Sequence, residues 1–361
     1  MEAGHGNSRE GNGLAANGGQ GGPPRSNRTR VLLIWGAIAF VLLFLTVGTI
    51  ALVLIAGTGG SGGIRGGGGS VDPPETFREE YVSGSGSDKI AVLPISGTIG
   101  PQESDPSPLT ASAATPETLR DQLLQAKEDE SVKAVILEID SPGGGSVATD
   151  QMHESVQDFK EETGKPVVVS MGTTAASGGY YISTAADRIV ANEGTLTGSL
   201  GVIFEYLNFT EAAEEYGIQQ EVVKSGPFKD IGSSTREPTE EELEILQTYV
   251  DEAYDQFVQV IVEGRGLPEE EVRALADGRV YSGLQAQSLG LVDDLGNMER
   301  ATEISEELSG LEEATVVRYK RQAGIGALLQ SRLAPSEPEA LQVMKAAGLN
   351  RTPELQYLYR P

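Results

Sequence analysis

The chain has 361 residues, of which 39% are hydrophobic, so it can bury a sizeable core in one or two domains. Its formal net charge of -26 argues against nucleic acid as a partner, because such a surface repels a phosphate backbone. Cysteine is absent, which excludes disulfides, thiol nucleophiles and cysteine metal sites.

The first 57 residues divide into a polar tail and an apolar span. Residues 1–30 are rich in Gly, Asn and Arg and poor in large apolar side chains, a composition typical of a disordered segment. Residues 31–57 carry no charge and exceed the roughly 20 residues that a membrane-spanning helix needs. A cleaved signal peptide is the alternative, but its apolar region would be only about 7–15 residues long. The sequence therefore predicts an uncleaved transmembrane helix over 31–57.

The charges beside this span predict its orientation. Arg25, Arg28 and Arg30 precede the span, whereas only Arg65 lies near its other end. The positive-inside rule then places the N-terminus in the cytoplasm and everything after residue 57 outside it. Residues 58–88 are rich in Gly and Ser, so we expect them to form a flexible tether between the membrane and a folded domain.

The region 89–318 has the pattern of a folded α/β domain. Three β-rich apolar runs, 90–93, 132–137 and 167–169, alternate with helical patterns, which predicts βα units on a largely parallel sheet. A helix is expected after Thr115, with this residue as N-cap and a proline at the first position.

A second helix is predicted after Thr239, and the regular pattern ends near residue 318. Thr239 and Glu242 form a capping box before apolar residues spaced by three and four, which predicts a helix facing the core or another subunit. Beyond residue 318 the pattern loosens, so 319–361 is interpreted as a C-terminal tail.

A candidate nucleophile follows the third apolar run. Ser177 stands between two alanines and two glycines, as expected for a serine at a strand-to-helix turn. The following glycine, Gly178, would let a substrate carbonyl approach closely, and its N–H could face the oxyanion formed on attack. The pattern favours acyl transfer, although a Ser-Gly-Gly alone is more often an ordinary turn.

A second glycine-rich loop, 140–145, follows the second apolar run. Ligand sites of parallel sheets lie at the C-terminal edge of the strands, where this loop is expected. It is either a tight turn or, beside Ser177, a second source of oxyanion donors, with Gly143 as the first choice. The loop lacks the Gly-Lys-Ser/Thr ending of a phosphate loop, so nucleotide binding is poorly supported.

The chain has two histidines that could take the serine proton. His5 lies in the predicted cytoplasmic tail, and His153 lies in a polar helical stretch, where we interpret it as a solvated surface residue. A Ser-His-Asp triad is therefore poorly supported.

A lysine can replace the histidine if desolvation favours its neutral amine. Lys224 and Lys229 lie in one short segment, and any single lysine is most often a solvated surface charge. Lys229 is narrowly preferred because Phe228 and Ile231 flank it.

Five motifs in this order and spacing resemble those of the SppA-type signal peptide peptidases, membrane serine proteases that share the fold of the Clp proteolytic subunit and the crotonases. They are 140–144, 176–181, 197–202, 224–230 and 290–293, and the resemblance covers roughly 89–296. It implies a Clp/crotonase-like βα-repeat fold, with Ser177 as nucleophile, Lys229 as general base, and the Gly143 and Gly178 amides as oxyanion donors. It further implies a ring-like homo-oligomer in which neighbouring subunits supply the serine and the lysine. The single repeat resembles the shorter members, whereas the long Gly-rich N-terminus departs from the pattern.

The sequence thus predicts a membrane-anchored serine endopeptidase that degrades cleaved signal peptides or other apolar segments. No ligand cluster suggests a cofactor or metal. A related membrane protease that cuts stomatin-like partners is one alternative, and a noncatalytic, acyl-thioester-binding member of the same fold is another. A regulatory hypothesis is that the apolar segment 355–359 occupies the active site.

Overall fold

The computed structural model of the protein describes residues 77–101, 114–321 and 355–359. The predicted tail 1–30, the predicted transmembrane helix 31–57 and most of the predicted tether lie outside these ranges. Within the described ranges, no helix has both the length and the apolar character needed to cross a bilayer.

A largely parallel sheet confirms the predicted α/β fold. Its strands are β1 Phe77–Ser83, β2 Lys89–Ser96, β3 Val132–Ser141, β5 Val167–Ala176, β6 Arg188–Ala191, β7 Leu196–Gly198, β9 Val280–Ser282, β10 Asp294–Leu295 and β11 Thr315–Arg321. They follow the order β1-β11-β2-β3-β5-β6-β10, with β7 beside β5 and β9 beside β7. All pairs are parallel except β1 with β11 and β7 with β9. The three apolar runs seen in the sequence are thus adjacent central strands.

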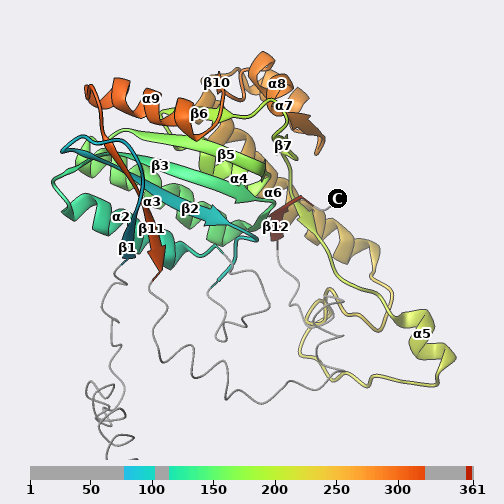
Figure 1. Ribbon diagram of the computed structural model, residues 1–361. Coiled ribbons are helices and arrows are strands. Elements are labelled where there is room, and N and C mark those ends of the chain that lie inside the picture. The colour runs from blue at the N-terminus through green and yellow to red at the C-terminus, as the bar shows by residue number, and fades with distance from the viewer. Residues whose placement is uncertain (1–76, 102–113, 322–354, 360–361) are drawn as a thin grey trace, which may run out of the picture. The chain divides into compact units, whose positions relative to one another are not determined.

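Helices cover both faces of this sheet. The helices that form these layers include α2 Pro116–Glu128, α3 Ser146–Thr163 and α9 Met298–Ser309. Figure 1 shows α9 on one face and α2 and α3 on the other. Ile90 and Val92 of β2 lie in the core cluster on the α9 face, whereas Ala91 and Leu93 lie in the cluster shared with α2 and α3. Burial on both faces requires the continuous apolar runs, because successive side chains of a strand point to opposite faces.

The remaining helices are α4 Gly178–Ser183, α5 Thr210–Glu215, α6 Glu240–Arg265, α7 Glu269–Leu275 and α8 Gly283–Ser288. Two predicted helix starts are confirmed. Thr115 caps α2 by accepting a hydrogen bond from the backbone N–H of Thr118. Thr239 and Glu242 form the predicted capping box at the start of α6. Both caps satisfy backbone donors that a helix N-terminus leaves unpaired.

The sheet extends beyond both boundaries that the sequence indicated. β1 lies inside the range 58–88 interpreted as a tether, and β11 continues past residue 318 into the predicted tail. The two strands pair with each other, from Phe77 opposite Arg321 to Ser83 opposite Val316. The sequence pattern does not reveal β1 because it is a polar edge strand in which only Phe77 is fully buried.

A small second sheet lies at the end of the central strands. It consists of β4 Gly143–Gly145, β8 Ile203–Phe204 and β12 Leu355–Leu358, with β12 in the middle. Both of its pairs are antiparallel. The second glycine-rich loop of the sequence therefore forms a short strand that pairs with a segment more than 200 residues away in the chain.

Candidate active site

Ser177 occupies the predicted strand-to-helix turn, between the end of β5 and the start of α4. Its φ of 53° and ψ of -116° lie in a region that residues other than glycine rarely adopt. The turn is fixed because the Ser177 N–H donates to the Gly198 carbonyl at 2.8 Å and the Ser177 carbonyl accepts from Tyr181 N–H at 2.9 Å. Only 1% of the residue is exposed. A strained, rigidly held serine of this kind is typical of functional sites.

The Ser177 hydroxyl is buried without a hydrogen-bond partner in the part of the chain that the structure describes. The same is true of Thr149 Oγ1 on α3. A Cβ atom placed on Gly178 would lie 2.7 Å from this threonine oxygen, so Thr149 borders the glycine that follows the serine. Buried polar atoms are nearly always paired, so two unpaired hydroxyls, one at this turn and one on the helix beside it, indicate a site. No motif in the sequence points to Thr149.

Gly143 and Gly178 lie next to each other, as expected for two parts of one oxyanion site. Gly143 has a φ of +95°, and a Cβ there would lie 2.6 Å from the Gly178 nitrogen and 2.0 Å from the Tyr357 carbonyl oxygen. Both positions therefore require glycine.

The N–H groups of these two glycines differ. The Gly143 N–H donates to Ser141 Oγ at 3.1 Å, so it is already engaged here, contrary to the expectation of a free donor. The local reason is that Ser141 Oγ, which itself donates to the Gly97 carbonyl, lies two residues before Gly143 and closes a short turn onto it. For the Gly178 N–H, the described residues provide no hydrogen-bond acceptor. Gly178 is thus the better placed donor.

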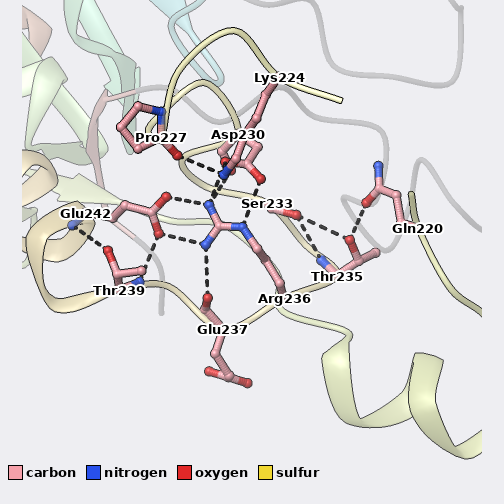
Figure 2. Close-up of polar contacts among 10 residues, drawn as sticks. All are labelled: Gln220, Lys224, Pro227, Asp230, Ser233, Thr235, Arg236, Glu237, Thr239 and Glu242. Carbon is pink, nitrogen blue, oxygen red and sulfur yellow. Dashed lines mark hydrogen bonds and ion pairs between the residues drawn. The ribbon is translucent and has the colours of Figure 1, made fainter. Parts of the chain in front are cut away.

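The segment that carries the two candidate lysines is held by a polar network (Figure 2). Lys224 Nζ donates to the Pro227 carbonyl at 2.8 Å and pairs with Asp230 at 2.6 Å. Arg236 binds the same Asp230 carboxylate at 2.8 Å and also pairs with Glu242, the capping-box residue of α6. Arg236 thereby ties the lysine segment to the start of a long helix.

The charges of this network shift two acidic groups. Hydrogen bonds from Arg236, and then from Lys224, hold the pKa of Asp230 well below its usual range. The hydrogen bond from Arg236 lowers the pKa of Glu242 to about 2. Both carboxylates are therefore ionised at neutral pH, and Lys224 is engaged with one of them in an ion pair.

Lys229 differs from Lys224 because its amine makes no ion pair or hydrogen bond with any residue that the structure describes. Its backbone N–H donates to the Gly226 carbonyl at 3.3 Å. The apolar surroundings expected for it are incomplete, since Lys229 is exposed and its neighbour Phe228 is 40% exposed. The described chain therefore presents a free amine and a free buried hydroxyl without joining them by a hydrogen bond.

His153 is not the surface residue that its polar helix suggested. The residue is 6% exposed, and its ring packs edge-on against Tyr181 with 5.2 Å between ring centroids. Burial lowers its pKa to about 4. The prediction was wrong because α3 packs against α4, which covers this face of the helix. Since Ser177 Oγ has no partner among the described residues, His153 forms no catalytic triad with it there.

No three His, Asp or Glu side chains gather closely enough to hold a metal ion in the ranges 77–101, 114–321 and 355–359. The chemistry that the described groups can support is acyl transfer. A buried serine hydroxyl, an adjacent free N–H and a surface lysine are its parts.

Comparison with known proteins agrees with this reading. Residues 159–312 match the family model described as Peptidase family S49. A protein of Enterococcus faecium assigned as a signal peptide peptidase SppA is 35% identical over 294 residues, which are 79% of this chain and 85% of that protein. Protease 4 of Haemophilus influenzae is 36% identical over 64% of this chain, and the chloroplastic serine protease SPPA of Arabidopsis thaliana is 33% identical over 65% of it. The chain spans 36% and 35% of the lengths of these two proteins.

Proposed function

The chain belongs to peptidase family S49 and is a serine peptidase, and from this premise we propose that Ser177 is its nucleophile and Lys229 its general base. One observation carries the proposal. The Ser177 hydroxyl is buried and unpaired among the described residues, at a strained turn beside the free N–H of Gly178. Such a hydroxyl has no structural task, so it is available for chemistry.

In the proposed reaction, the neutral amine of Lys229 takes the proton from Ser177 Oγ as this oxygen attacks a peptide carbonyl carbon. The Gly178 N–H stabilises the oxyanion, while the missing side chain of Gly143 leaves room for the carbonyl to approach. The lysine then protonates the leaving amine as the C–N bond breaks, which leaves an acyl-serine ester. Water hydrolyses the ester by the reverse proton path, and both residues return to their first state.

The two catalytic groups are proposed to meet between neighbouring copies of the chain. Lys229 is exposed, and large apolar side chains are exposed around its segment and along the first half of α6. They include Leu207, Phe209, Tyr216, Ile218, Val223, Phe228, Leu243, Ile245 and Tyr249. Such a set supports a protein interface, because monomeric proteins seldom leave large apolar patches uncovered. A homo-oligomer would cover these residues, and burial would favour the neutral amine of Lys229.

The proposed substrates are apolar peptide segments outside the cytoplasm, cleaved signal peptides among them. The name of the relative in Enterococcus faecium supports a signal peptide peptidase. The uncharged span 31–57 supports anchoring by one transmembrane helix, with the N-terminus in the cytoplasm and the catalytic domain outside. The net charge of -26 argues against nucleic acid as a substrate.

The test is peptidase activity of the full chain in detergent on an apolar signal-like peptide. We expect Ser177→Ala and Lys229→Ala each to lower kcat/KM by at least about 1,000-fold. Lys229→Arg should be equally inactive, because a guanidinium keeps its proton. Lys224→Ala is the matched control and should keep activity within about fivefold of the unmodified chain, since it removes a neighbouring lysine that is engaged in an ion pair.

Retained cleavage in Ser177→Ala would refute the nucleophile, and absence of cleavage by the unmodified chain would favour a noncatalytic binding role. If Lys224→Ala abolishes peptidase activity while Lys229→Ala keeps it, the assignment of Lys229 as the base is refuted.

A further inference from the structure

The proposed oxyanion site has only one free backbone donor among the described residues. The Gly178 N–H has no acceptor there, whereas the Gly143 N–H donates to Ser141 Oγ at 3.1 Å. Ser141 Oγ is itself held in place, because it donates to the Gly97 carbonyl at 2.6 Å. Oxyanion sites combine backbone N–H groups with side-chain donors, hydroxyls among them. A side chain that borders Gly178 can therefore supply the second donor.

Thr149 of α3 borders this glycine. A Cβ atom on Gly178 would lie 2.7 Å from Thr149 Oγ1 and 3.1 Å from the Gly143 Cα atom. The threonine oxygen and Gly143 thus lie on the same side of Gly178, where the glycine lacks a side chain. Thr149 is 0% exposed, so bulk solvent does not reach its hydroxyl. The hydroxyl is therefore buried beside the gap between the two glycines.

The Thr149 hydroxyl differs from two other hydroxyls on α3. Ser155 Oγ donates to the Gln151 carbonyl at 2.7 Å, and Thr163 Oγ1 donates to the Phe159 carbonyl at 2.6 Å. Both use the carbonyl four residues earlier, a common partner of a helical serine or threonine. Thr149 is more deeply buried than either, yet its hydroxyl has no partner within the described ranges. Because an unpaired buried hydroxyl costs stability, its presence indicates a partner that arrives with the substrate.

We propose that the Thr149 hydroxyl is the second donor to the oxyanion. As Ser177 Oγ attacks, the carbonyl oxygen of the substrate gains negative charge and accepts hydrogen bonds from Thr149 Oγ1 and from the Gly178 N–H. Since the hydroxyl has no acceptor among the described residues, no bond to them is lost when it turns to the new oxygen. This role rests on the proposed function of Ser177, whereas the unpaired state of the hydroxyl does not.

The unpaired state is tested by urea unfolding of the full chain in detergent. Thr149→Val replaces the hydroxyl by a methyl group of similar shape, so we expect a midpoint at or above that of the unmodified chain. Thr163→Val is the matched control on the same helix, and it should unfold at lower urea because it loses its bond to Phe159. A midpoint for Thr149→Val that falls as in the control would overturn the inference, because the hydroxyl would then have a partner in the folded chain.

The catalytic role is tested by cleavage of the apolar signal-like peptide. Thr149→Val should lower kcat about 100-fold and leave KM within about twofold, as expected for the loss of one oxyanion donor. Thr149→Ser keeps the hydroxyl and should retain kcat within about fivefold, and Thr163→Val should be as active as the unmodified chain. Unchanged kcat in Thr149→Val, or equal losses in the valine and serine variants, would overturn the role of the hydroxyl.

Inhibition by a peptide aldehyde isolates the oxyanion itself. Ser177 Oγ bonds to the aldehyde carbon, the C=O double bond becomes a single bond to an anionic oxygen, and the serine proton passes to Lys229. Thr149→Val should weaken this inhibition about 100-fold, but it should weaken inhibition by the corresponding peptide alcohol less than about threefold, because the alcohol forms no such oxygen. Equal weakening of both inhibitors would contradict the proposal.

The two levels of the argument fail in different ways. If the unmodified chain cleaves no peptide, or if Ser177→Ala keeps its activity, the proposed function fails and the role of Thr149 fails with it. If Ser177→Ala and Lys229→Ala are inactive while Thr149→Val is fully active, the role of Thr149 alone is refuted.

Discussion

The two halves of the proposed catalytic pair are built in opposite ways. Ser177 is buried at the C-terminal end of the interior strand β5, in a turn fixed by backbone hydrogen bonds and by close glycine contacts. Lys229 is exposed, on a segment held to α6 through the ion pairs of Arg236. The serine half depends on packing, which is the same in any environment that folds the chain. The lysine half depends on charges at the surface and on a neighbour that would cover it.

The contrast between the buried serine and the exposed lysine indicates where activity can be controlled. A nucleophile that is held in the core is ready as soon as the chain folds, whereas a base on an exposed segment becomes effective only when assembly desolvates and places it. In the proposed enzyme, the chain makes the serine site by itself and a homo-oligomer completes the pair.

The largest effect is expected in the serine half, from Gly143→Ala. A Cβ atom there meets the Gly178 nitrogen at 2.6 Å and the Tyr357 carbonyl at 2.0 Å, so β4 has to move from the proposed oxyanion site. We expect kcat/KM to fall at least about 100-fold. Gly164→Ala is the control, since Gly164 also has positive φ but no described atom lies within 4 Å of its Cβ position. It should cost about 1 kcal/mol of stability and leave activity unchanged. Full activity of Gly143→Ala would contradict the site.

As pH falls, the stability that depends on His153, beside the serine site, should be lost before the stability that depends on Glu242 in the lysine network. Unfolded histidine titrates near pH 6.5, whereas burial lowers the pKa of folded His153 to about 4, so unfolding takes up a proton between these values. Stability should therefore fall by up to about 3 kcal/mol as pH drops from 6.5 to 4 and should receive no such penalty above 6.5.

Urea unfolding at several pH values measures this effect, with His153→Gln as the comparison. The variant should lose this part of the pH dependence, and identical pH profiles would contradict the assignment.

The contribution of the lysine half to stability responds at lower pH. Pairing with Arg236 lowers the pKa of Glu242 from 4.5 to about 2, so its contribution is present above pH 4.5 and is lost as pH falls toward 2.

A smaller effect is expected from Arg236→Gln, which removes the shared partner of Asp230 and Glu242. The segment that carries Lys229 would lose its link to α6, so we expect kcat to fall about tenfold while the Ser177 turn stays intact. Arg279→Gln breaks another arginine-aspartate pair, with Asp277, and should change kcat less than twofold. Equal kcat values for the two variants would show that the network has no part in placing the lysine.

Much of the serine half could be predicted from sequence because its signals are local. Apolar runs gave the central strands, and a serine among glycines after a strand gave the turn at Ser177. The boundary strand β1 escaped because a polar edge strand lacks an apolar period. The buried state of His153 escaped because the covering helix lies elsewhere in the chain.

The lysine half shows the limit of sequence reasoning more clearly. Phe228 and Ile231 beside Lys229 suggested desolvation, yet Lys229 and Phe228 are exposed in the single chain and Ile231 is half-buried, since neighbours in sequence do not fix what covers a side chain. The ion pair that occupies Lys224 depends on Asp230 and on a surface loop, and no periodicity reports it. The pairing of β12 with β4 is a contact between distant segments, and only its apolar character was visible in the sequence.

The most direct test of the central claim is to mix two inactive chains, Ser177→Ala and Lys229→Ala, after dissociating and reassembling them together. If neighbouring chains supply the serine and the lysine, random assembly of equal amounts gives both intact groups at about one site in four. The mixture should then regain about a quarter of the unmodified activity, while each variant alone stays inactive. A mixture that reassembles fully and remains inactive would contradict it.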